Sequence, residues 1–312
     1  EMQRSLVGSE MCIRDSMWGA RSDVGCVRPH NEDSYLVQSP LFCVCDGMGG
    51  HAAGEVASSI AVETIAKTAP QSADAARLAA AVEAANAAVI EAALNGLGKP
   101  GMGCTATCAY IENDTLAIAH VGDSRAYLLH EGTLIRVTRD HSYVEELVDA
   151  GEITADEARV HPNRSVITRA LGSDPAMYAD HFTLHIEEGD RLILCSDGLS
   201  SMIPDSDIEN IATQSSTAQI CVDNLVDAAL AAGGHDNVTV VVVDLVDDGV
   251  MREAQRVRRR NVTIAAILAL VFVLAAGIWA YTGVTGSYYL GTYQGNLSLI
   301  HISEPTRLRC IS

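Results

Sequence analysis

The chain has 312 residues, 48% hydrophobic and 20% charged, which is typical of a globular protein and not of a disordered one. Its formal net charge of -19 argues against a nucleic-acid-binding protein, because such proteins normally carry a basic face. The 9 cysteines include no Cys-x-x-Cys pair, so we expect reduced, buried thiols in a cytosolic setting. An acidic chain of this kind needs cations in order to handle phosphate.

The two ends of the chain differ from the rest. Residues 1–16 and 297–312 show no amphipathic period that continues into their neighbours, and both are similar to translated library-adapter sequence. We therefore expect both segments to be non-native and the folded domain to occupy residues 17–248.

Apolar segments between residues 17 and 248 predict β-strands. They are YLVQ (35–38), LFCVCD (41–46), CTATCAYIEN (104–113), TLAIAHVGD (115–123), RAYLLHEGTLIRVT (125–138), HFTLHIEEGDRLILCSDG (181–198) and NVTVVVVDL (237–245). Turn residues at Asn113-Asp114, Glu131-Gly132 and Glu188-Gly189 predict hairpins, and hairpins imply antiparallel sheets. The last segment is almost continuously apolar, so we expect it to be covered on both faces.

Helices are predicted over residues 54–69, 73–94 and 216–234, the last ending in two glycines. Strands joined by hairpins, with helices between them, indicate an α+β fold. The expected architecture is an α-β-β-α sandwich of two antiparallel sheets with outer helices.

Beyond this domain, residues 249–261 form an arginine-rich segment that precedes an uncharged stretch, residues 262–281. A buried core helix is a poor explanation, because the stretch is about long enough to span a hydrocarbon core of roughly 30 Å. The arginines fit the positive-inside rule. We therefore expect a basic juxtamembrane linker, a C-terminal transmembrane helix and, at 282–296, the start of a truncated extracytoplasmic region. The domain before it would be cytoplasmic, in a single-pass protein of the cell membrane.

Aspartates stand at the ends of several predicted strands. Asp46 and Asp197 each follow an apolar run and precede a glycine, Asp123 ends another strand, and Asp236 precedes the last one. Turn chemistry alone explains any single Asp-Gly pair. Several carboxylates brought to one edge of the fold would repel one another without a counter-charge, and oxygen ligands select hard cations such as Mg²⁺ or Mn²⁺.

A second polar segment, RSDVGCVRPHNEDS, lies near the start of the domain. Arg28 offers a guanidinium fork suited to two phosphate oxygens, while Glu32 and Asp33 extend the acidic set. The alternative for Arg28 is a surface ion pair with one of the many carboxylates.

The ordered motifs SDVGCVRPHNED, CDGMGGHAAGE, GCTATCAYI, AHVGDSRAYLL, RDHSYVEELVDAGEI, RSVITRALG, LILCSDGLS and HDNVTVVVV resemble the metal-dependent Ser/Thr protein phosphatases of the PP2C type, the PPM family. The resemblance covers roughly residues 19–247, and the set is far more specific than any single motif. The arginine block and apolar stretch are further similar to membrane-anchored actinobacterial members, which oppose receptor-like Ser/Thr kinases.

The resemblance implies a role for each matching metal ligand. Asp46 would bridge two Mn²⁺ or Mg²⁺ ions, with the Gly47 carbonyl on one of them, and Asp197 and Asp236 would hold the first ion. Glu32 and Asp33 would support the second ion, and Asp123 with Asp197 a weaker third one.

The resemblance also implies roles around the metals. Arg28 would bind the phosphate, and Asn237 would support the neighbouring ligand. Many eukaryotic relatives carry a histidine directly after the Asp-Gly pair, where this chain has Met48. His51 is therefore a general-acid candidate, with a helix-start or surface histidine as an equal alternative.

The implied activity is hydrolysis of phosphoserine and phosphothreonine in proteins by direct attack of a metal-bound hydroxide. Expected partners are phosphorylated proteins, including Ser/Thr kinases, and not nucleic acids. The segment from Asp140 to Gly172 resembles the family's flap beside the site. Two other functions stay open: a catalytically silent phosphoprotein-binding module, and a cytoplasmic partner of an extracellular sensor.

Overall fold

The computed structural model describes residues 17–49, 53–245, 288–293 and 296–301. The chain divides into two units, residues 1–248 and 249–312, and each is considered by itself.

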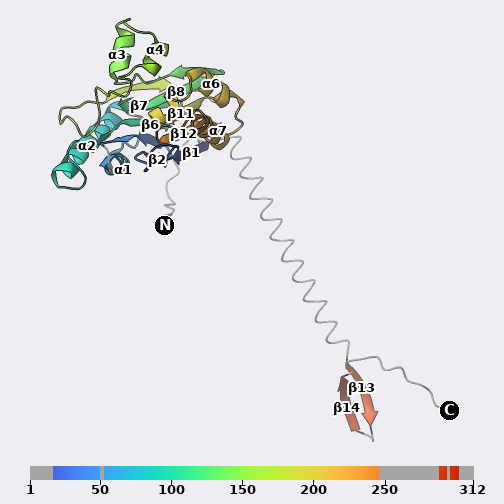
Figure 1. The fold of residues 1–312 in the computed structure, drawn as a ribbon. Coiled ribbons are helices and arrows are strands. Elements are labelled where there is room, and N and C mark those ends of the chain that lie inside the picture. Colours follow the sequence, from blue (N-terminus) through green and yellow to red (C-terminus); the bar gives the residue numbers. More distant parts are fainter. Residues whose placement is uncertain (1–16, 50–52, 246–287, 294–295, 302–312) are drawn as a thin grey trace. The chain divides into compact units, whose positions relative to one another are not determined.

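Two five-stranded antiparallel sheets form the centre of the first unit (Figure 1). The first sheet has the order β1 (Met17–Asp23), β12 (Val238–Asp244), β11 (Arg191–Cys195), β8 (Arg125–His130) and β9 (Thr133–Arg136). The second has the order β10 (Asp180–His185), β7 (Thr115–Val121), β6 (Ala106–Glu112), β3 (Leu41–Cys45) and β2 (Ser34–Gln38). A short pair, β4 (Gly47–Met48) and β5 (Gly103–Cys104), lies beside them.

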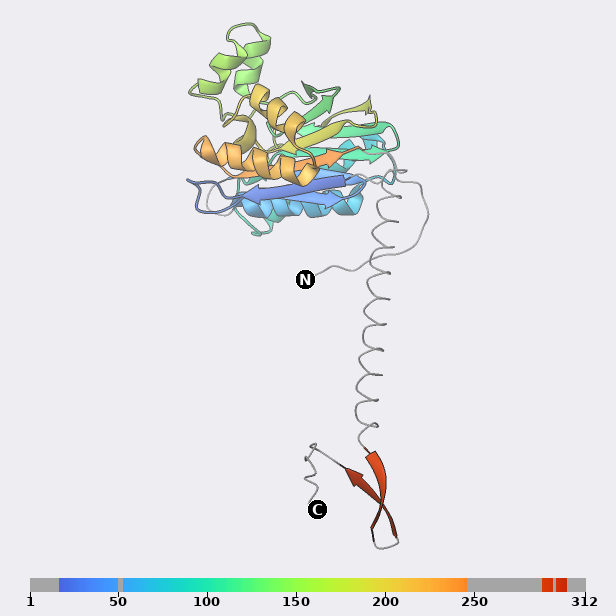
Figure 2. The same ribbon diagram turned by 90° about the vertical axis from the view of Figure 1, so that its right-hand side faces the viewer.

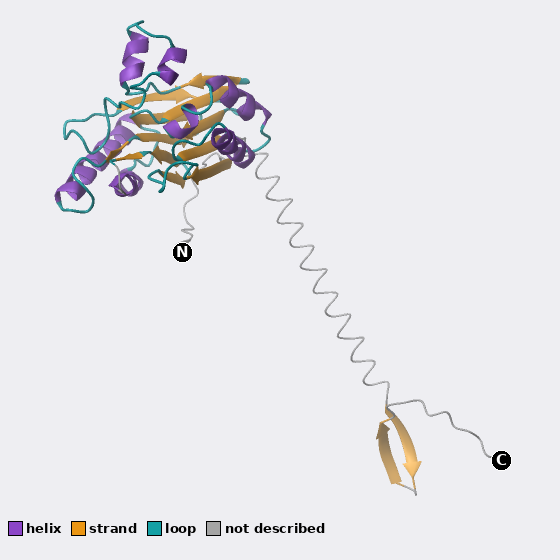
Figure 3. Cartoon of the chain, in the orientation of Figure 1, coloured by secondary structure: helices purple, strands orange, loops and turns teal. Residues whose placement is uncertain are grey.

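Helices cover the outer face of each sheet (Figure 3). Helices α1 (Ala53–Thr68) and α2 (Ala75–Leu94) pack on the second sheet, and α5 (Asp197–Ser200), α6 (Asp205–Gln214) and α7 (Ala218–Ala231) pack on the first. Between the sheets lies a separate apolar layer that includes Phe42, Ile118 and Leu194. The predicted α-β-β-α sandwich is confirmed.

The expected burial of the last strand is also confirmed. In β12 every residue from Val238 to Val243 is buried. Its alternate side chains pack against α7 on one face and against the opposite sheet on the other. A strand enclosed on both faces favours valine throughout, because no position faces water.

A small helical segment stands apart from the layers. Helices α3 (Tyr143–Asp149) and α4 (Ala155–Val160) project away from the sandwich in both views (Figures 1 and 2). Ser142 caps α3, and Thr154 with Glu157 forms a capping box at α4, so each helix begins at a residue suited to that position. We call residues 142–168 the flap.

Two of the three expected hairpins are present. The turns at Asn113-Asp114 and Glu131-Gly132 join β6 to β7 and β8 to β9, with Asn113, Glu131 and Gly132 at positive φ. The prediction of a hairpin at Glu188-Gly189 is wrong, because β10 pairs with β7 whereas β11 pairs with β8 and β12. The turn carries the chain from one sheet to the other. Strand β10 alternates between exposed and partly buried residues, whereas β11 is fully buried, which fits an edge and an interior position.

In the second unit, β13 (Tyr288–Tyr293) and β14 (Asn296–His301) form an antiparallel hairpin. It crosses the boundary expected at residue 297. Within the described part of the chain, no helix is long and apolar enough to cross a membrane. The expected span at 262–281 lies outside the described residues and remains a prediction.

Candidate metal centre

Four aspartates converge where strands of both sheets end. Asp46 follows β3 and Asp123 follows β7, both in the second sheet, while Asp197 follows β11 and Asp236 precedes β12 in the first. The strand order predicted that Asp46, Asp197 and Asp236 meet at one edge of the fold, and the structure brings them together with Asp123. Their roles as metal ligands stay predictions. The structure adds that the four side chains come from opposite layers, so the site lies across the end of the sandwich.

The four carboxylates and Asp33 influence one another electrostatically. Burial first, and then the charges of Asp33, Asp197, Asp123 and Asp236, raise the pKa of Asp46 well above its usual range. Burial and Asp236 raise the pKa of Asp197 to about 6, against a lowering hydrogen bond with Asp46. Several acidic groups held so close stay ionised together only if cations compensate them.

Asp33 is fixed by hydroxyl groups from the first sheet. Its Oδ2 accepts hydrogen bonds from Ser196 Oγ at 2.9 Å and from Thr239 Oγ1 at 2.6 Å. Its Oδ1 is buried and has no hydrogen-bond partner. Burial, above all, raises the pKa of Asp33 to about 7. An orphaned carboxylate oxygen beside Asp46, Asp197 and Asp236 is the donor that a hard cation requires.

Asp123 repeats this pattern. Its Oδ1 is buried without a hydrogen-bond partner, and burial followed by the charge of Asp197 raises its pKa. The second orphaned oxygen therefore points to a cation position beside Asp197.

Glu32 is packed against two glycines. A Cβ on Gly47 would lie 2.4 Å from the carbonyl oxygens of Glu32 and Gly54, and one on Gly54 would lie 2.7 Å from Glu32 Oε2. Only glycine allows this approach, so Gly47 holds its place through space and not through turn conformation.

Asn237 joins the two acidic segments. Its Oδ1 accepts a hydrogen bond from Glu32 N at 2.8 Å, and its amide donates to the carbonyls of Val24 and His30 at 2.9 and 3.0 Å. The loop that carries Arg28, Glu32 and Asp33 is thereby fastened to the start of β12. These hydrogen bonds are consistent with the supporting role predicted for Asn237.

Arg28 lies at the mouth of the site. Its Nη2 donates to Asp236 Oδ2 at 2.7 Å, and its side chain is 51% exposed. The structure therefore contains the ion pair that was the alternative for Arg28. About half of the Arg28 side chain nevertheless faces solvent beside the acidic cluster, where a phosphate would approach.

The residues present fit divalent cations bound partly through water. Among the described residues, no three His, Cys, Asp or Glu side chains converge tightly enough to enclose an ion by themselves. Mg²⁺-type sites commonly use one or two carboxylates and retain several waters. The all-oxygen donor set, the two orphaned carboxylate oxygens and the raised pKa values agree with that type of site.

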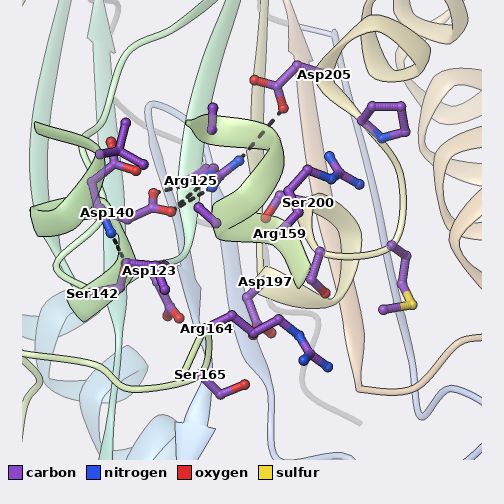
Figure 4. Close-up of a pocket in the computed structure, with 18 of the residues that line it drawn as sticks. Asp123, Arg125, Asp140, Ser142, Arg159, Arg164, Ser165, Asp197, Ser200 and Asp205 are labelled. Carbon is purple, nitrogen blue, oxygen red and sulfur yellow. Dashed lines mark hydrogen bonds and ion pairs between the residues drawn. The ribbon is translucent and has the colours of Figure 1, made fainter. Parts of the chain in front are cut away.

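A cavity of about 410 Å³ adjoins the aspartates. Asp123, Asp197 and Asp236 line one side, and the flap lines another through residues that include Arg159, Arg164 and Ser165 (Figure 4). At its wall Arg125 binds Asp140 with both carboxylate oxygens and reaches Asp205 at 3.7 Å. The cavity is large enough for a phosphorylated side chain with its neighbours.

Sequence reasoning missed the residues that position the ligands. Ser196 and Thr239, which hold Asp33, lie beside or within predicted strands and resemble ordinary strand residues. No spacing rule marks them, since their role depends on which strands become neighbours. His51 lies outside the described residues, and its predicted role stays a prediction.

Residues 14–238 match the family Protein phosphatase 2C. The chain belongs to this family. It is 43% identical over 236 residues to the serine/threonine protein phosphatase PstP of Mycobacterium tuberculosis, a match that covers 74% of this chain and 45% of that protein. It is 37% identical over 236 residues to the serine/threonine phosphatase stp of Listeria monocytogenes, covering 72% of this chain and 94% of that protein.

A solved structure supports the same relationship. The catalytic domain of PstP in complex with 2 manganese ions superposes with a TM-score of 0.69 at 40% identity, covering 74% of this chain and 99% of that one. The chain spans about half the length of the mycobacterial relative.

Proposed function

We propose that the domain is a metal-dependent phosphatase that hydrolyses phosphoserine and phosphothreonine in proteins. The observation that carries this proposal is the convergence of Asp46, Asp123, Asp197 and Asp236 from both sheets, with Arg28 at the mouth. Family membership and the manganese-bound relative support it.

The acidic residues would hold Mn²⁺ or Mg²⁺, two core ions and a third near Asp123. When bound, the ions supply an acidified water and offset the charge of the phosphate. Asp46 reaches Asp197 across the sandwich and would serve both core positions, with Asp236 beside Asp197. Glu32 and Gly47 lie against Gly54 in α1, and Glu32, Asp33 and the Gly47 carbonyl would support the second ion.

This chain's own residues perform the remaining tasks. Arg28 is positioned by Asp236 to donate hydrogen bonds to two phosphate oxygens, and its exposed face allows a substrate to reach it. Ser196 and Thr239 keep the Asp33 carboxylate oriented. The flap closes one side of the cavity and would contact the protein substrate.

We further propose that the protein is anchored in the membrane and opposes the action of Ser/Thr kinases at the cytoplasmic face. The arginine-rich segment at 249–261 and the uncharged stretch at 262–281 support this proposal. A silent phosphoprotein-binding module is less favoured, because all four converging aspartates are retained. The third function, a cytoplasmic partner of a sensor, depends on the chain beyond residue 281.

Phosphate release from a phosphothreonine peptide tests the proposal. The chain is first treated with a chelator and then assayed with and without added Mn²⁺ or Mg²⁺. We expect no activity after chelation and recovery with either ion. Activity that survives thorough chelation would contradict the metal mechanism, and binding of the peptide without turnover would favour the silent module.

A further inference from the structure

His141 lies at the junction between the flap and the sheets, and it is buried. Its backbone N–H donates to the Gly122 carbonyl at 2.7 Å, and its carbonyl accepts from Thr168 N at 2.8 Å. On the ring, Nδ1 accepts from Gly122 N at 3.0 Å, and Nε2 lies 3.1 Å from Asp180 Oδ2. All four polar atoms of His141 therefore make hydrogen bonds, and their partners Gly122, Thr168 and Asp180 lie on three separate segments of the chain.

These contacts define the state of the ring. Because the Gly122 N–H can only donate, Nδ1 must present its lone pair, and in the neutral ring Nε2 carries the hydrogen. Nε2–H then donates to the Asp180 carboxylate, whose other oxygen accepts from Arg169 Nη1 at 2.6 Å.

Gly122 has no side chain, so only contacts of its backbone can hold it in place. It has φ +111°, and a Cβ there would lie 2.5 Å from the Thr105 side chain, so only glycine fits. His141 binds both backbone groups of Gly122: its Nδ1 accepts from the Gly122 N–H, and its own N–H donates to the Gly122 carbonyl. Asp123 is the next residue, so the same two bonds restrain the backbone from which its carboxylate extends.

Both ends of the flap attach at the same point. Ser142 caps α3, and Tyr143 N donates to the Val166 carbonyl at 2.9 Å. Ser142 also forms a bridge with Ile167, next to the bond between Thr168 and His141. One residue therefore joins the flap's two ends to the strand end that carries Asp123.

We propose that His141 is a positioning residue that holds Asp123 in a fixed arrangement with the flap. The inference rests on the proposed function, because it takes Asp123 as a ligand of the auxiliary ion. His141 would act through the hydrogen bond that its Nδ1 accepts from Gly122 N. The competing explanation is a buried histidine that only stabilises the fold.

Near-isosteric variants separate the two ring bonds. In His141→Asn the side-chain oxygen can replace Nδ1 and keep the Gly122 bond, whereas His141→Gln reaches toward Asp180 and loses it. His141→Met loses both bonds at similar volume. Asp180→Asn is the matched control, since it weakens the Nε2 contact and leaves Gly122 alone.

The primary measurement is Mn²⁺ binding to the full chain by calorimetry. His141→Gln and His141→Met should bind the weakest Mn²⁺ about tenfold less tightly, the scale expected for loss of a partner that orients a ligand. His141→Asn and Asp180→Asn should stay near wild type. Hydrogen exchange on the metal-free chain should show faster exchange at 122–123 and in the flap for Gln and Met only.

Two results would overturn the proposal. One is a common loss of melting temperature in all four variants with unchanged Mn²⁺ binding, which would leave His141 a structural residue. The other is a tenfold loss in His141→Asn equal to that in His141→Gln. Combining Asp123→Asn with His141→Gln should add no further loss of weak binding. Phosphopeptide turnover by the wild type is assayed separately, so that failure of the proposed function is seen independently.

Discussion

Arg28 Nη2 donates a 2.7 Å hydrogen bond to Asp236 Oδ2, which places the expected phosphate ligand directly on an expected metal ligand. The contact orients the guanidinium from one side and leaves its other side exposed. It also raises the pKa of Arg28, first through this hydrogen bond, so the side chain stays charged throughout the working pH range.

Replacing Arg28 with alanine should raise KM for phosphopeptides about tenfold and lower kcat less, because a group that holds phosphate before and during reaction contributes binding throughout. Arg28→Lys, which keeps the charge and loses the fork, should lie between. Steady-state kinetics beside a thermal melt measures both effects. An exposed ion pair is worth under about 1 kcal/mol, so an unchanged kcat/KM with a small loss of melting temperature would make Arg28 structural.

Asp46→Asn and Asp123→Asn should differ in activity. Asp46 lies among all the other carboxylates, so its loss should lower kcat by more than about a hundredfold, beyond the usual effect of losing a supporting partner. Asp123→Asn should mainly raise the Mn²⁺ concentration needed for full activity. Circular dichroism controls for folding. Near-normal turnover by Asp46→Asn at saturating Mn²⁺ would refute its assignment.

The metal-free protein should lose stability as pH rises. The pKa of Asp197 is raised to about 6 and that of Asp33 to about 7, so the folded state binds protons more tightly than the unfolded chain. Their contribution is complete below about pH 4 and is lost as pH rises through those values. Melting temperatures in chelator across this range should therefore fall, and Mn²⁺ should restore them near neutral pH.

Asp33→Asn should flatten this pH dependence, because it removes one of the titrating groups. Asp74→Asn is the control, since Asp74 is a half-exposed helix cap remote from the site. A slope that is the same in all three proteins would show that other groups cause it.

Arg125→Met should destabilise the fold by about 3–5 kcal/mol, because it leaves the buried Asp140 without its partner. Tyr127, whose hydroxyl accepts from Arg125 and donates to Asp205, would also lose a contact. Denaturant unfolding measures the change. The matched control is Arg77→Met, which breaks an exposed pair with Asp74 and should cost under about 1 kcal/mol. Equal losses of unfolding free energy in the two variants would mean that the buried Arg125 network stabilises the fold no more than an exposed ion pair.

The sequence predicted the layers and the acidic residues because both depend on local pattern. An apolar run that ends in an aspartate is visible in Asp46 and Asp197 without any knowledge of neighbours. The partners of β10 and β11 were not visible, since a turn residue does not say which sheet the chain enters next. Strand β1 was missed because MWGARSD alternates weakly, and its strand form depends on pairing with β12.

The positioning residues were missed for a related reason. His141 lies in a recognisable motif, but its positioning role depends on hydrogen bonds with Gly122 and Asp180. These residues are 19 and 39 positions away in the sequence. Ser196 gains its role only when β11 and β12 become neighbours. Such contacts exist in the folded chain alone, and no residue pattern encodes them.

Strand β12 is made last in the domain, yet it pairs with β1, which is made first, and lies between β1 and β11. Asp236 and Asn237 immediately precede it, so the final segment closes the sheet and completes the site in one step. During synthesis, a chain stopped before residue 236 carries most of its acidic residues but lacks the segment that fastens the Arg28 loop. On the proposed function, the growing polypeptide would therefore be unable to hydrolyse phosphoproteins near the ribosome, and activity would begin only when the whole domain has emerged.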